Sequence, residues 1–342
     1  MRVLFVCPEL PSPGSPGSMA PAARQIESLR DAGIEIDVVD MRGIPKLKYI
    51  QLLPLICRLA KQVDIIHAHY GYCGWLARIA LLFTPRKLLV MSFMGDDLLG
   101  TPINPEGGLS WFSELMISLN IRLAGLVDCV IVKSQEMAAV VDPVNARVIP
   151  NGVDIESFHP MDQNVSRQAI GLPPDDKCVL FPGNPDNPRK GHALARAAIL
   201  VAERELGEPI KLLPLWGVDP SKVVVTMTAC DAMLMTSLIE GSPNVVKEAM
   251  ACEVPIISVP VGDVEQLLDG VSGCHVCPRD AETLGKQLAR TLLSPGCQGR
   301  NAIIARGLDL ESVARQIVTE YKKVLGELTE VAAHQVMEEK ER

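Results

Sequence analysis

Short apolar runs alternate with longer amphipathic stretches from the first residue to about residue 280. Short apolar runs bounded by Gly, Pro, Asn or Asp are typical of strands, and the stretches between them have helical periodicity. The predicted strands are residues 2–7, 35–40, 64–68, 87–92, 129–133, 147–149, 178–182, 210–215, 232–235, 255–259 and a short strand near His275. Helices are expected between them, as at 190–206, and a last amphipathic helix is expected at about 310–327. This alternation predicts an α/β protein whose parallel sheets are covered by helices on both faces.

The rhythm of strands and helices breaks in a polar stretch at 151–176 that is rich in Pro, Asp and Asn. We therefore expect two doubly wound, Rossmann-like domains, at 1–155 and 156–310. The helix at about 310–330 is expected to pack back on the first domain, and 331–342 to form a frayed tail. Ligands of such sheets bind beyond the carboxyl ends of the strands, so two sheets facing each other would place a cleft between them.

Composition narrows the class of protein. The chain has 342 residues, 48% of them hydrophobic and 22% charged, which is enough for two buried cores. Its formal net charge of -8 leaves no domain-wide basic excess, so no nucleic-acid partner is expected. The ten cysteines stand mostly alone in apolar stretches, as buried thiols in a reducing compartment do. From these thiols we expect a cytoplasmic protein. No uninterrupted apolar span of about eighteen residues occurs, so no membrane-crossing segment is expected.

Two carboxylates, Glu240 and Glu248, flank a small proline-containing turn. Ser242 suits the N-cap of a helix and Pro243 its first position, so a helix is predicted to begin here. Glu248 then lies one turn into the helix and leans toward the same end that Glu240 approaches. Such a pair can accept hydrogen bonds from the vicinal hydroxyls of a ribose or hexose. The spacing is equally compatible with an acid that merely ends a strand and another that is solvated.

Positive charge is expected close to this helix start. Its unpaired amides near Asn244 and Val245, together with the helix dipole, can bind a phosphate or sugar hydroxyls. Arg189 and Lys190 follow a strand and a proline-rich loop at 181–191, and this pair of cations suits a diphosphate. The alternative is a solvated basic pair.

A third loop follows the first strand. Residues 8–18 contain Gly14, Gly17 and several prolines, which place permissive backbone at the carboxyl end of that strand. The loop can approach a phosphate or can be a simple turn. A GxGxxG fingerprint and a phosphate-binding P-loop are both missing from the sequence, which disfavours NAD-dependent and ATP-hydrolysing chemistry.

Assembled in order, these segments resemble the retaining glycosyltransferases of family 4, which have the two-domain B-type glycosyltransferase (GT-B) fold. The resemblance covers nearly the whole chain. It rests on Pro150-Asn151-Gly152-Val153-Asp154 with Phe158, Gly183 to Gly191, Ala229-Cys230-Asp231, Ser237-Leu238-Ile239-Glu240-Gly241, Glu248-Ala249-Met250-Ala251-Cys252, Pro255-Ile256-Ile257 with Gly262, and Asp269-Gly270 with Gly273.

The resemblance implies a role for each matched residue. In this family the acid matching Glu248 holds the ribose hydroxyls of a nucleotide sugar, and the acid matching Glu240 contacts the transferred sugar. Lys190 matches the lysine that offsets the charge of the leaving group. The implied catalytic residues are Glu240, Lys190 and Arg189. The implied substrate-binding residues are Glu248, Gly241, Ser242, Pro243, Asn244, Val245, Gly14, Gly17, Gly183, Asn184 and Asp97.

Two positions depart from the family pattern. Asn184 stands where many relatives have an arginine after the glycine, and Arg189 is expected to supply that cation instead. Met94 stands where a histidine is expected. Asp96 or Asp97 is a candidate to replace its polar function, although an aspartate that caps the loop is an equally good interpretation.

The resemblance implies a metal-independent, retaining hexosyltransferase, and no Asp-x-Asp sequence occurs in the chain. It would move a hexosyl unit from a nucleotide diphosphate sugar to a glycan or lipid-linked glycan, in polysaccharide or glycolipid synthesis. No cofactor is expected beyond the donor substrate. One alternative is a non-catalytic partner subunit that binds nucleotide sugar, and another is a nucleotide-sugar epimerase of the same fold.

A basic and apolar stretch at 42–61 is a candidate contact with membrane lipid. Such a segment can lie on an anionic membrane surface where a lipid-linked acceptor resides, as in a peripheral protein at the inner face of the cell membrane. The favoured interpretation is an ordinary amphipathic helix packed on its own sheet, here interrupted by Pro54.

Overall fold

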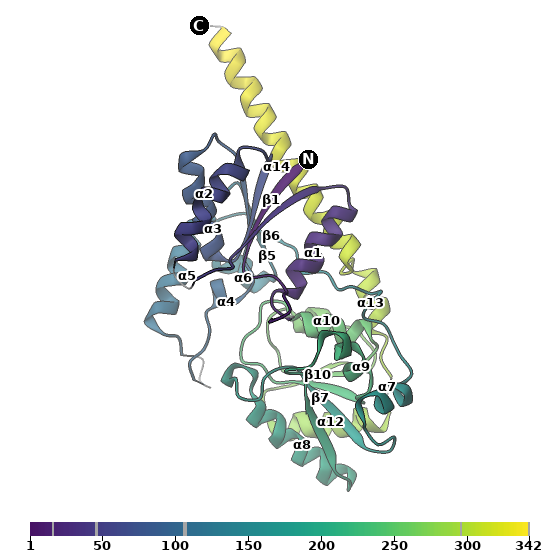
Figure 1. Cartoon of the computed structure of the whole chain (residues 1–342). Helices are drawn as coiled ribbons and strands as arrows, with labels where there is room; N and C mark the ends of the chain where they lie inside the picture. The colour runs from purple at the N-terminus through teal and green to yellow at the C-terminus, as the bar shows by residue number, and fades with distance from the viewer. Residues whose placement is uncertain (16, 45–46, 105–107, 295, 341–342) are drawn as a thin grey trace. The chain divides into compact units, whose positions relative to one another are not determined.

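The computed structural model in Figure 1 describes the chain except at residues 16, 45–46, 105–107, 295 and 341–342, and it describes side chains as far as residue 326. Contacts within the chain group it into two compact units. Unit 1 comprises residues 1–98, 116–150 and 311–342, and unit 2 comprises 99–115 and 151–310. The predicted division into 1–155 and 156–310 differs from this grouping at 99–115 and at 151–155.

Unit 1 is built on a six-stranded parallel sheet with the order β2-β1-β3-β4-β5-β6. Each predicted strand of the first half is present. The strands are β1 (Arg2–Cys7), β2 (Glu35–Asp40), β3 (Ile65–His69), β4 (Leu88–Ser92), β5 (Cys129–Val132) and β6 (Arg147–Val148). The helices between them are α1 (Ala20–Asp31), α2 (Lys48–Ala60), α3 (Gly71–Ala80), the 3-10 helix η1 (Leu81–Phe83), α4 (Asp96–Leu99), α5 (Trp111–Ala124) and α6 (Gln135–Val140).

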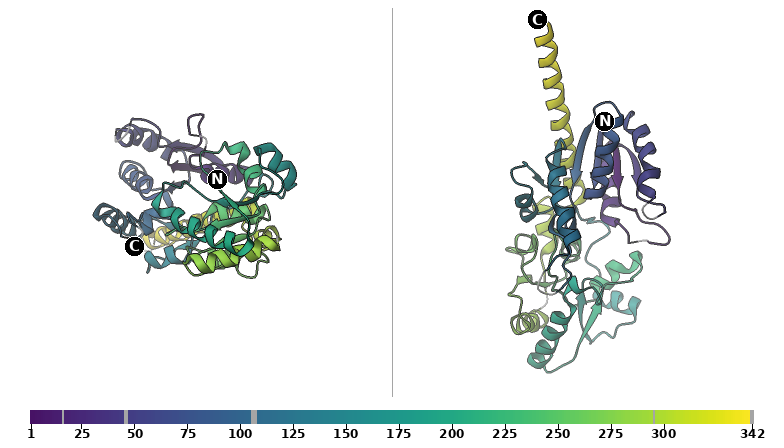
Figure 2. Two further views of the ribbon diagram at one scale, coloured as in Figure 1. Left: turned by 90° about the horizontal axis from the view of Figure 1, so that it is seen from below. Right: turned by 90° about the vertical axis from the view of Figure 1, so that its left-hand side faces the viewer.

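The last helix, α14 (Leu310–Lys340), contributes to the core of unit 1. Its apolar side chains pack with β1, β3 and α1, and it is the yellow helix in Figures 1 and 2. Tyr321 is fully buried and its hydroxyl lies 2.5 Å from Nδ1 of His67, whose Nε2 lies 2.8 Å from the hydroxyl of Ser92. The helix extends through Lys340, and the side chains of the predicted frayed tail, 331–342, lie outside the described residues.

Unit 2 is built on a five-stranded parallel sheet with the order β11-β10-β9-β7-β8. Its strands are β7 (Lys177–Phe181), β8 (Ile210–Pro214), β9 (Ala232–Met235), β10 (Ile256–Ser258) and β11 (His275–Val276). Its helices are α7 (Gln163–Ile170), η2 (Pro188–Lys190), α8 (His192–Leu206), η3 (Pro220–Lys222), α9 (Val223–Thr228), α10 (Asn244–Ala251), α11 (Val264–Leu268), α12 (Ala281–Leu293) and α13 (Gly299–Ala305).

Alternate residues of β7 enter different cores, which explains why the strand is apolar throughout. Cys178 and Leu180 face a core completed by α9, α10 and α13, whereas Val179 and Phe181 face one completed by α8 and α12. Figure 1 shows these helices on the two faces of the sheet. A strand buried on both faces has no polar alternation, so the apolar runs of the sequence correspond to parallel strands.

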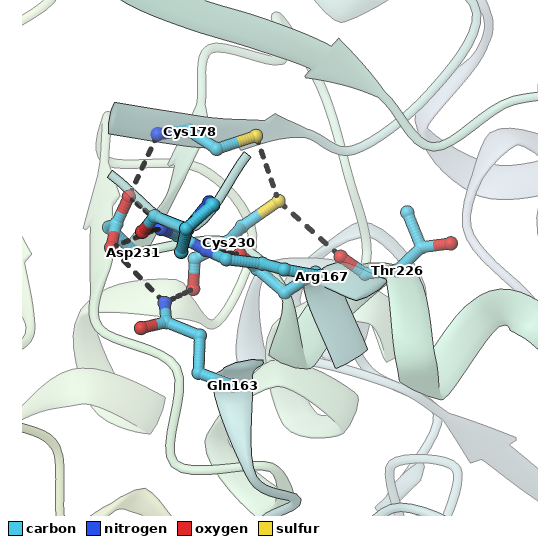
Figure 3. Close-up of polar contacts among 8 residues, drawn as sticks. Gln163, Arg167, Cys178, Thr226, Cys230 and Asp231 are labelled. Carbon is cyan, nitrogen blue, oxygen red and sulfur yellow. Dashed lines mark hydrogen bonds and ion pairs between the residues drawn. The ribbon is translucent and has the colours of Figure 1, made fainter. Parts of the chain in front are cut away.

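A buried ion pair fixes α7 to this sheet (Figure 3). Nη2 of Arg167 donates to both carboxylate oxygens of Asp231 at 2.9 Å, and its Nε donates to the carbonyl of Ala229 at 3.0 Å. Asp231 also accepts from the amide of Cys178 at 2.8 Å and from the side chain of Gln163 at 3.1 Å. The Asp231 of the family motif therefore has a structural role in this chain.

Candidate active site

A helix begins in the segment between the two acids, but one residue later than predicted. α10 starts at Asn244, and Pro243 occupies the N-cap position without a side-chain capping bond. The prediction that Ser242 caps this helix is wrong, because Pro243 stands at the N-cap, and the hydroxyl of Ser242 accepts instead from Nζ of Lys247 at 3.0 Å. Glu240 lies five residues beyond the end of β9, in the turn rather than on the strand.

Lys190 and Glu240 meet beyond the carboxyl ends of β7 and β9. Nζ of Lys190 donates to Oε1 of Glu240 at 2.6 Å, and both side chains are mostly buried, with 15% and 12% exposed. The stem of Lys190 lies over Gly183, where a Cβ would stand 3.0 Å from the lysine side chain. Gly183 therefore provides the space that Lys190 occupies.

The loop that carries Lys190 is joined to the loop after β9 by backbone hydrogen bonds. The amide of Leu238 donates to the carbonyl of Arg189 at 2.7 Å, and the hydroxyl of Thr236 donates to the carbonyls of Lys190 and Gly191 at 3.0 Å each. A Cβ on Gly191, whose φ is +67°, would stand 2.2 Å from the carbonyl oxygen of Thr236. Only glycine fits this approach, so the position of η2 is set by β9.

A third loop, which follows β10, packs against the same turn. A Cβ on Gly262 would stand 2.5 Å from the carbonyl oxygen of Gly241 and 2.7 Å from that of Glu240. The φ of Gly262 is +55°. Three loops from adjacent strands thus converge at one edge of the sheet, as expected for a ligand site of a parallel sheet.

The first two turns of α10 present polar groups near this edge. Oδ1 of Asn244 is buried and has no hydrogen-bond partner within the described part of the chain. Glu248, on the next turn, is 9% exposed. Val245 packs its side chain against the apolar core, so only its amide is a candidate for substrate contact.

The residues of the proline-rich loop mainly shape the turn. Oδ1 of Asn184 accepts from the amide of Asp186 at 3.0 Å, and Oδ1 of Asn187 caps η2 through the amide of Arg189 at 3.1 Å. The helix predicted from residue 190 is instead η2 followed by α8, because Gly191 has a left-handed backbone. The guanidinium of Arg189 has no partner among the side chains that the structure describes, so it can bind an anion.

The candidates Asp97, Gly14 and Gly17 belong to unit 1. Asp97 accepts from the amides of Met94 at 2.9 Å and Gly95 at 3.0 Å. Burial raises the pKa of Asp97 to about 7, against the opposing effect of these hydrogen bonds. This geometry favours the loop-capping interpretation of Asp97. A Cβ on Gly14 or Gly17 would meet no atom within 4 Å.

The sequence did not single out Lys247 or Asp263. Lys247 is fully buried, and burial lowers its pKa to about 8. Asp263 is 6% exposed, and burial raises its pKa. The only signal for Lys247 in the sequence is its place among the apolar positions of α10. A lysine in a helix is usually solvated, so this position alone does not indicate a buried charge.

The cysteine, histidine and carboxylate side chains do not gather into a metal site in the described part of the chain. Within the described residues no group of three or more His, Cys, Asp or Glu side chains could hold a metal ion. Cys274 and Cys277 stand in a Cys-x-x-Cys spacing, but the sulfur of Cys274 lies 3.5 Å from that of Cys297. No helix in the described part of the chain is long and apolar enough to cross a membrane.

Comparison with known proteins decides the family. Residues 3–157 match the model of Glycosyltransferase Family 4, and residues 186–294 match the model of Glycosyl transferases group 1. The chain belongs to this glycosyltransferase family. As a family 4 member it is similar to the D-inositol 3-phosphate glycosyltransferase of Actinosynnema mirum, with 25% identity over 305 residues, which cover 75% of this chain and 72% of that protein.

A second relative and two solved structures extend this comparison. The D-inositol 3-phosphate glycosyltransferase of Mycobacterium marinum is 26% identical over 315 residues, 78% of this chain and 65% of that protein. Sucrose-phosphate synthase from Thermosynechococcus elongatus has a TM-score of 0.75 at 20% identity, covering 95% of this chain and 100% of the other. Anabaena HepE in complex with UDP and glucose has a TM-score of 0.69 at 20% identity, covering 94% and 100%. The fold of this glycosyltransferase is therefore GT-B, with two parallel-sheet α/β domains.

Proposed function

We propose that this chain is a retaining glycosyltransferase that moves a hexosyl unit from a nucleotide diphosphate sugar to a glycan or lipid-linked acceptor. The observation that carries the proposal is the 2.6 Å pair of Lys190 and Glu240 beside the turn that opens α10. This pair combines a cation for the phosphates with a carboxylate for sugar hydroxyls at the carboxyl edge of one sheet.

The donor side of the site is assigned to unit 2. The diphosphate would contact Lys190, Arg189 and the first amides of α10, where the positive end of the helix dipole adds to their charge. Glu248 would accept from the ribose hydroxyls, and Asn244 from a hydroxyl of the sugar. The complex of HepE, a protein of similar fold, with UDP and glucose supports a uridine nucleotide as the first donor to test.

The reaction needs no protein nucleophile. The bond between the anomeric carbon and the phosphate oxygen breaks with its electron pair on the oxygen, and the acceptor oxygen forms the new bond on the same face. The acceptor proton passes to the diphosphate oxygen. Lys190 and Arg189 stabilise the negative charge that develops on the leaving diphosphate. Stabilisation of developing charge by fixed groups is usually the largest single contribution to catalysis. This charge supply supports a metal-independent reaction.

Turnover with a panel of uridine, guanosine and adenosine diphosphate sugars tests the proposal. Slow hydrolysis of one donor is expected, and it should persist in EDTA and be lost in Lys190→Ala. The matched control is Lys286→Ala, which removes a half-exposed lysine paired with Glu282 at 2.8 Å on α12. With an acceptor, NMR of the product should show the anomeric configuration of the donor, and an inverted linkage would contradict the proposal. Binding without turnover would favour the non-catalytic partner.

A lipid-linked acceptor would require contact with a membrane surface, and unit 1 has a surface that suits it. Leu82 and Phe83 of η1 are 68% and 67% exposed, and η1 packs beside the end of α2, where Arg58 and Lys61 are exposed. Apolar side chains with nearby cations are favourable at an anionic bilayer. Flotation with anionic and neutral vesicles at low and high salt tests this, and Phe83→Ser should reduce binding. Equal recovery with both vesicle types would contradict it.

A further inference from the structure

Two residues of types that often cap helices, Ser242 and Asp263, lie near helix starts at the donor site without capping them. Ser242 precedes α10, and Asp263 occupies the N-cap position of α11, yet neither helix start has a side-chain capping bond. Ser242 and Asp263 are 8% and 6% exposed, respectively. Residues of these types often cap a helix, so their other surroundings are of interest, above all for Ser242, whose hydroxyl has a different partner.

That interaction is with Lys247, which is fully buried. Its Nζ donates to the hydroxyl of Ser242 at 3.0 Å. The same hydroxyl lies near the carboxylate of Asp263 and lowers its pKa against the effect of burial, while Oδ1 of Asp263 has no hydrogen-bond partner among the described residues. Lys247 also attracts Asp263 electrostatically. Lys247 and Asp263 are thus a buried cation and a buried anion beside the same hydroxyl. A charge in such a place is costly unless it has a counter-charge, so the cation and the anion depend on each other.

The three residues surround the turn that carries Glu240. Lys247 reaches back to it from the second turn of α10. Asp263 approaches from the loop after β10, where Gly262 brings the backbone against the carbonyl oxygens of Glu240 and Gly241. The turn is thus held on two sides by elements that themselves belong to the core of unit 2.

We propose that Lys247, Ser242 and Asp263 form a buried network that holds the turn of Glu240 in the conformation that receives the nucleotide sugar. This inference rests on the proposed function. Lys247 is fully buried and does not reach the substrate, so it is a positioning residue. Without it the turn samples other conformations, and the donor binds only the fraction of molecules in the competent one.

The test compares Lys247→Met with wild type at pH 7. Methionine keeps the length and apolar stem of lysine but removes its charge. Calorimetric titration with uridine, guanosine and adenosine diphosphates is expected to show binding about tenfold weaker for the nucleotide that wild type prefers, the size of effect typical of losing a hydrogen bond to a charged group. Hydrogen exchange of amides 240–245 in the unliganded protein is expected to be faster. Lys286→Met on α12 is the matched control and should change neither quantity.

The outcomes separate this inference from the proposed function. A folded Lys247→Met variant with unchanged affinity and unchanged exchange would overturn the positioning role alone, even if its melting temperature were lower. Wild-type protein that binds none of the three nucleotides would overturn the proposed function, and the inference with it. Should Lys247→Met fail to fold, the isosteric Asp263→Asn variant decides, with a smaller loss of affinity and faster exchange at the same amides expected.

Discussion

Unit 2 contains two buried ion pairs that differ in how many bonds hold them. Arg167 and Asp231 use several donors and acceptors each, including backbone groups of β7 and of the segment before β9 (Figure 3). Lys190 and Glu240 share one bond, and neither side chain has another partner within the described chain. Both pairs are mostly shielded from solvent. A saturated pair fixes one structure, whereas a pair with unused donors and acceptors can exchange its partner for a ligand.

The largest expected effect is on stability, from the saturated pair. Asp231→Ala leaves the guanidinium of Arg167 buried without its counter-charge, and we expect the free energy of unfolding to fall by about 3 to 5 kcal/mol. Denaturant titration followed by circular dichroism measures this. Glu240→Gln in the same experiment should lose less than about 1 kcal/mol, and an equal loss in the two variants would remove the distinction between the pairs.

The next largest expected effect is on catalysis, from the pair of Lys190 and Glu240, which share a single hydrogen bond. Glu240→Gln keeps the shape of the side chain but removes the carboxylate, and we expect the rate of sugar transfer to fall by about 10² to 10³-fold, since the group acts where charge develops. The kcat and KM for the donor measure it, with the circular dichroism spectrum unchanged. Near-normal turnover would show that this carboxylate does not contact the reacting sugar.

Alanine substitutions at two glycines, Gly191 and Gly207, test how tightly the loop of Lys190 packs on the loop after β9. Gly191→Ala places a Cβ 2.2 Å from the carbonyl oxygen of Thr236, at a φ of +67°. We expect a loss of about 2 to 3 kcal/mol in the free energy of unfolding from the clash and the left-handed backbone. Gly207→Ala has a similar φ of +73° with no atom within 4 Å, so about 1 kcal/mol is expected there. Equal losses would indicate that the approach to Thr236 is not tight.

The smallest expected effect is on the pH dependence of stability, from the buried side chain of Lys247. Burial lowers its pKa to about 8 from the ordinary 10.5. Between these values the unfolded chain binds more protons than the folded one, so this group makes the free energy of unfolding rise with pH. Relative to Lys247→Met, wild type should gain about 1 kcal/mol between pH 8 and pH 9. Thermal or denaturant unfolding across this range measures the difference, and parallel curves for the two proteins would show that Lys247 titrates normally.

The sequence predicted the strands well because each is an apolar run buried on both faces. β1, β2 and β9 have the predicted bounds, and the other strands for which bounds were predicted differ by one residue at one or both ends. Several of these differences fall at a polar residue or a proline, as at Asp64, Lys133 and Pro182. Periodicity is therefore sufficient for the sheets of this fold.

The site was predicted less completely. The predicted cation Lys190 and the predicted acid Glu240 lie in contact. The prediction that Ser242 caps α10 was wrong. A capping residue is recognised from its neighbours in sequence, whereas the hydroxyl of Ser242 accepts from Lys247, a lysine that is fully buried in the folded unit. The roles of Gly191 and Gly262 likewise depend on distant parts of the chain, because each approaches a backbone carbonyl of the segment that follows β9. Such three-dimensional approaches leave no periodic signal in a single sequence.

The contribution of α14 to unit 1 has a consequence for biosynthesis. Phe5 and Ile65 share a core with Val313, Ile317 and Val324. During translation the first unit therefore lacks part of its interior until α14 has left the ribosome, on the order of 10 to 40 s after residue 150 at usual elongation rates. The second unit, mostly continuous in sequence, is expected to fold before the first is complete. Chaperones that cover exposed apolar surface would accordingly act on the N-terminal segment during this interval.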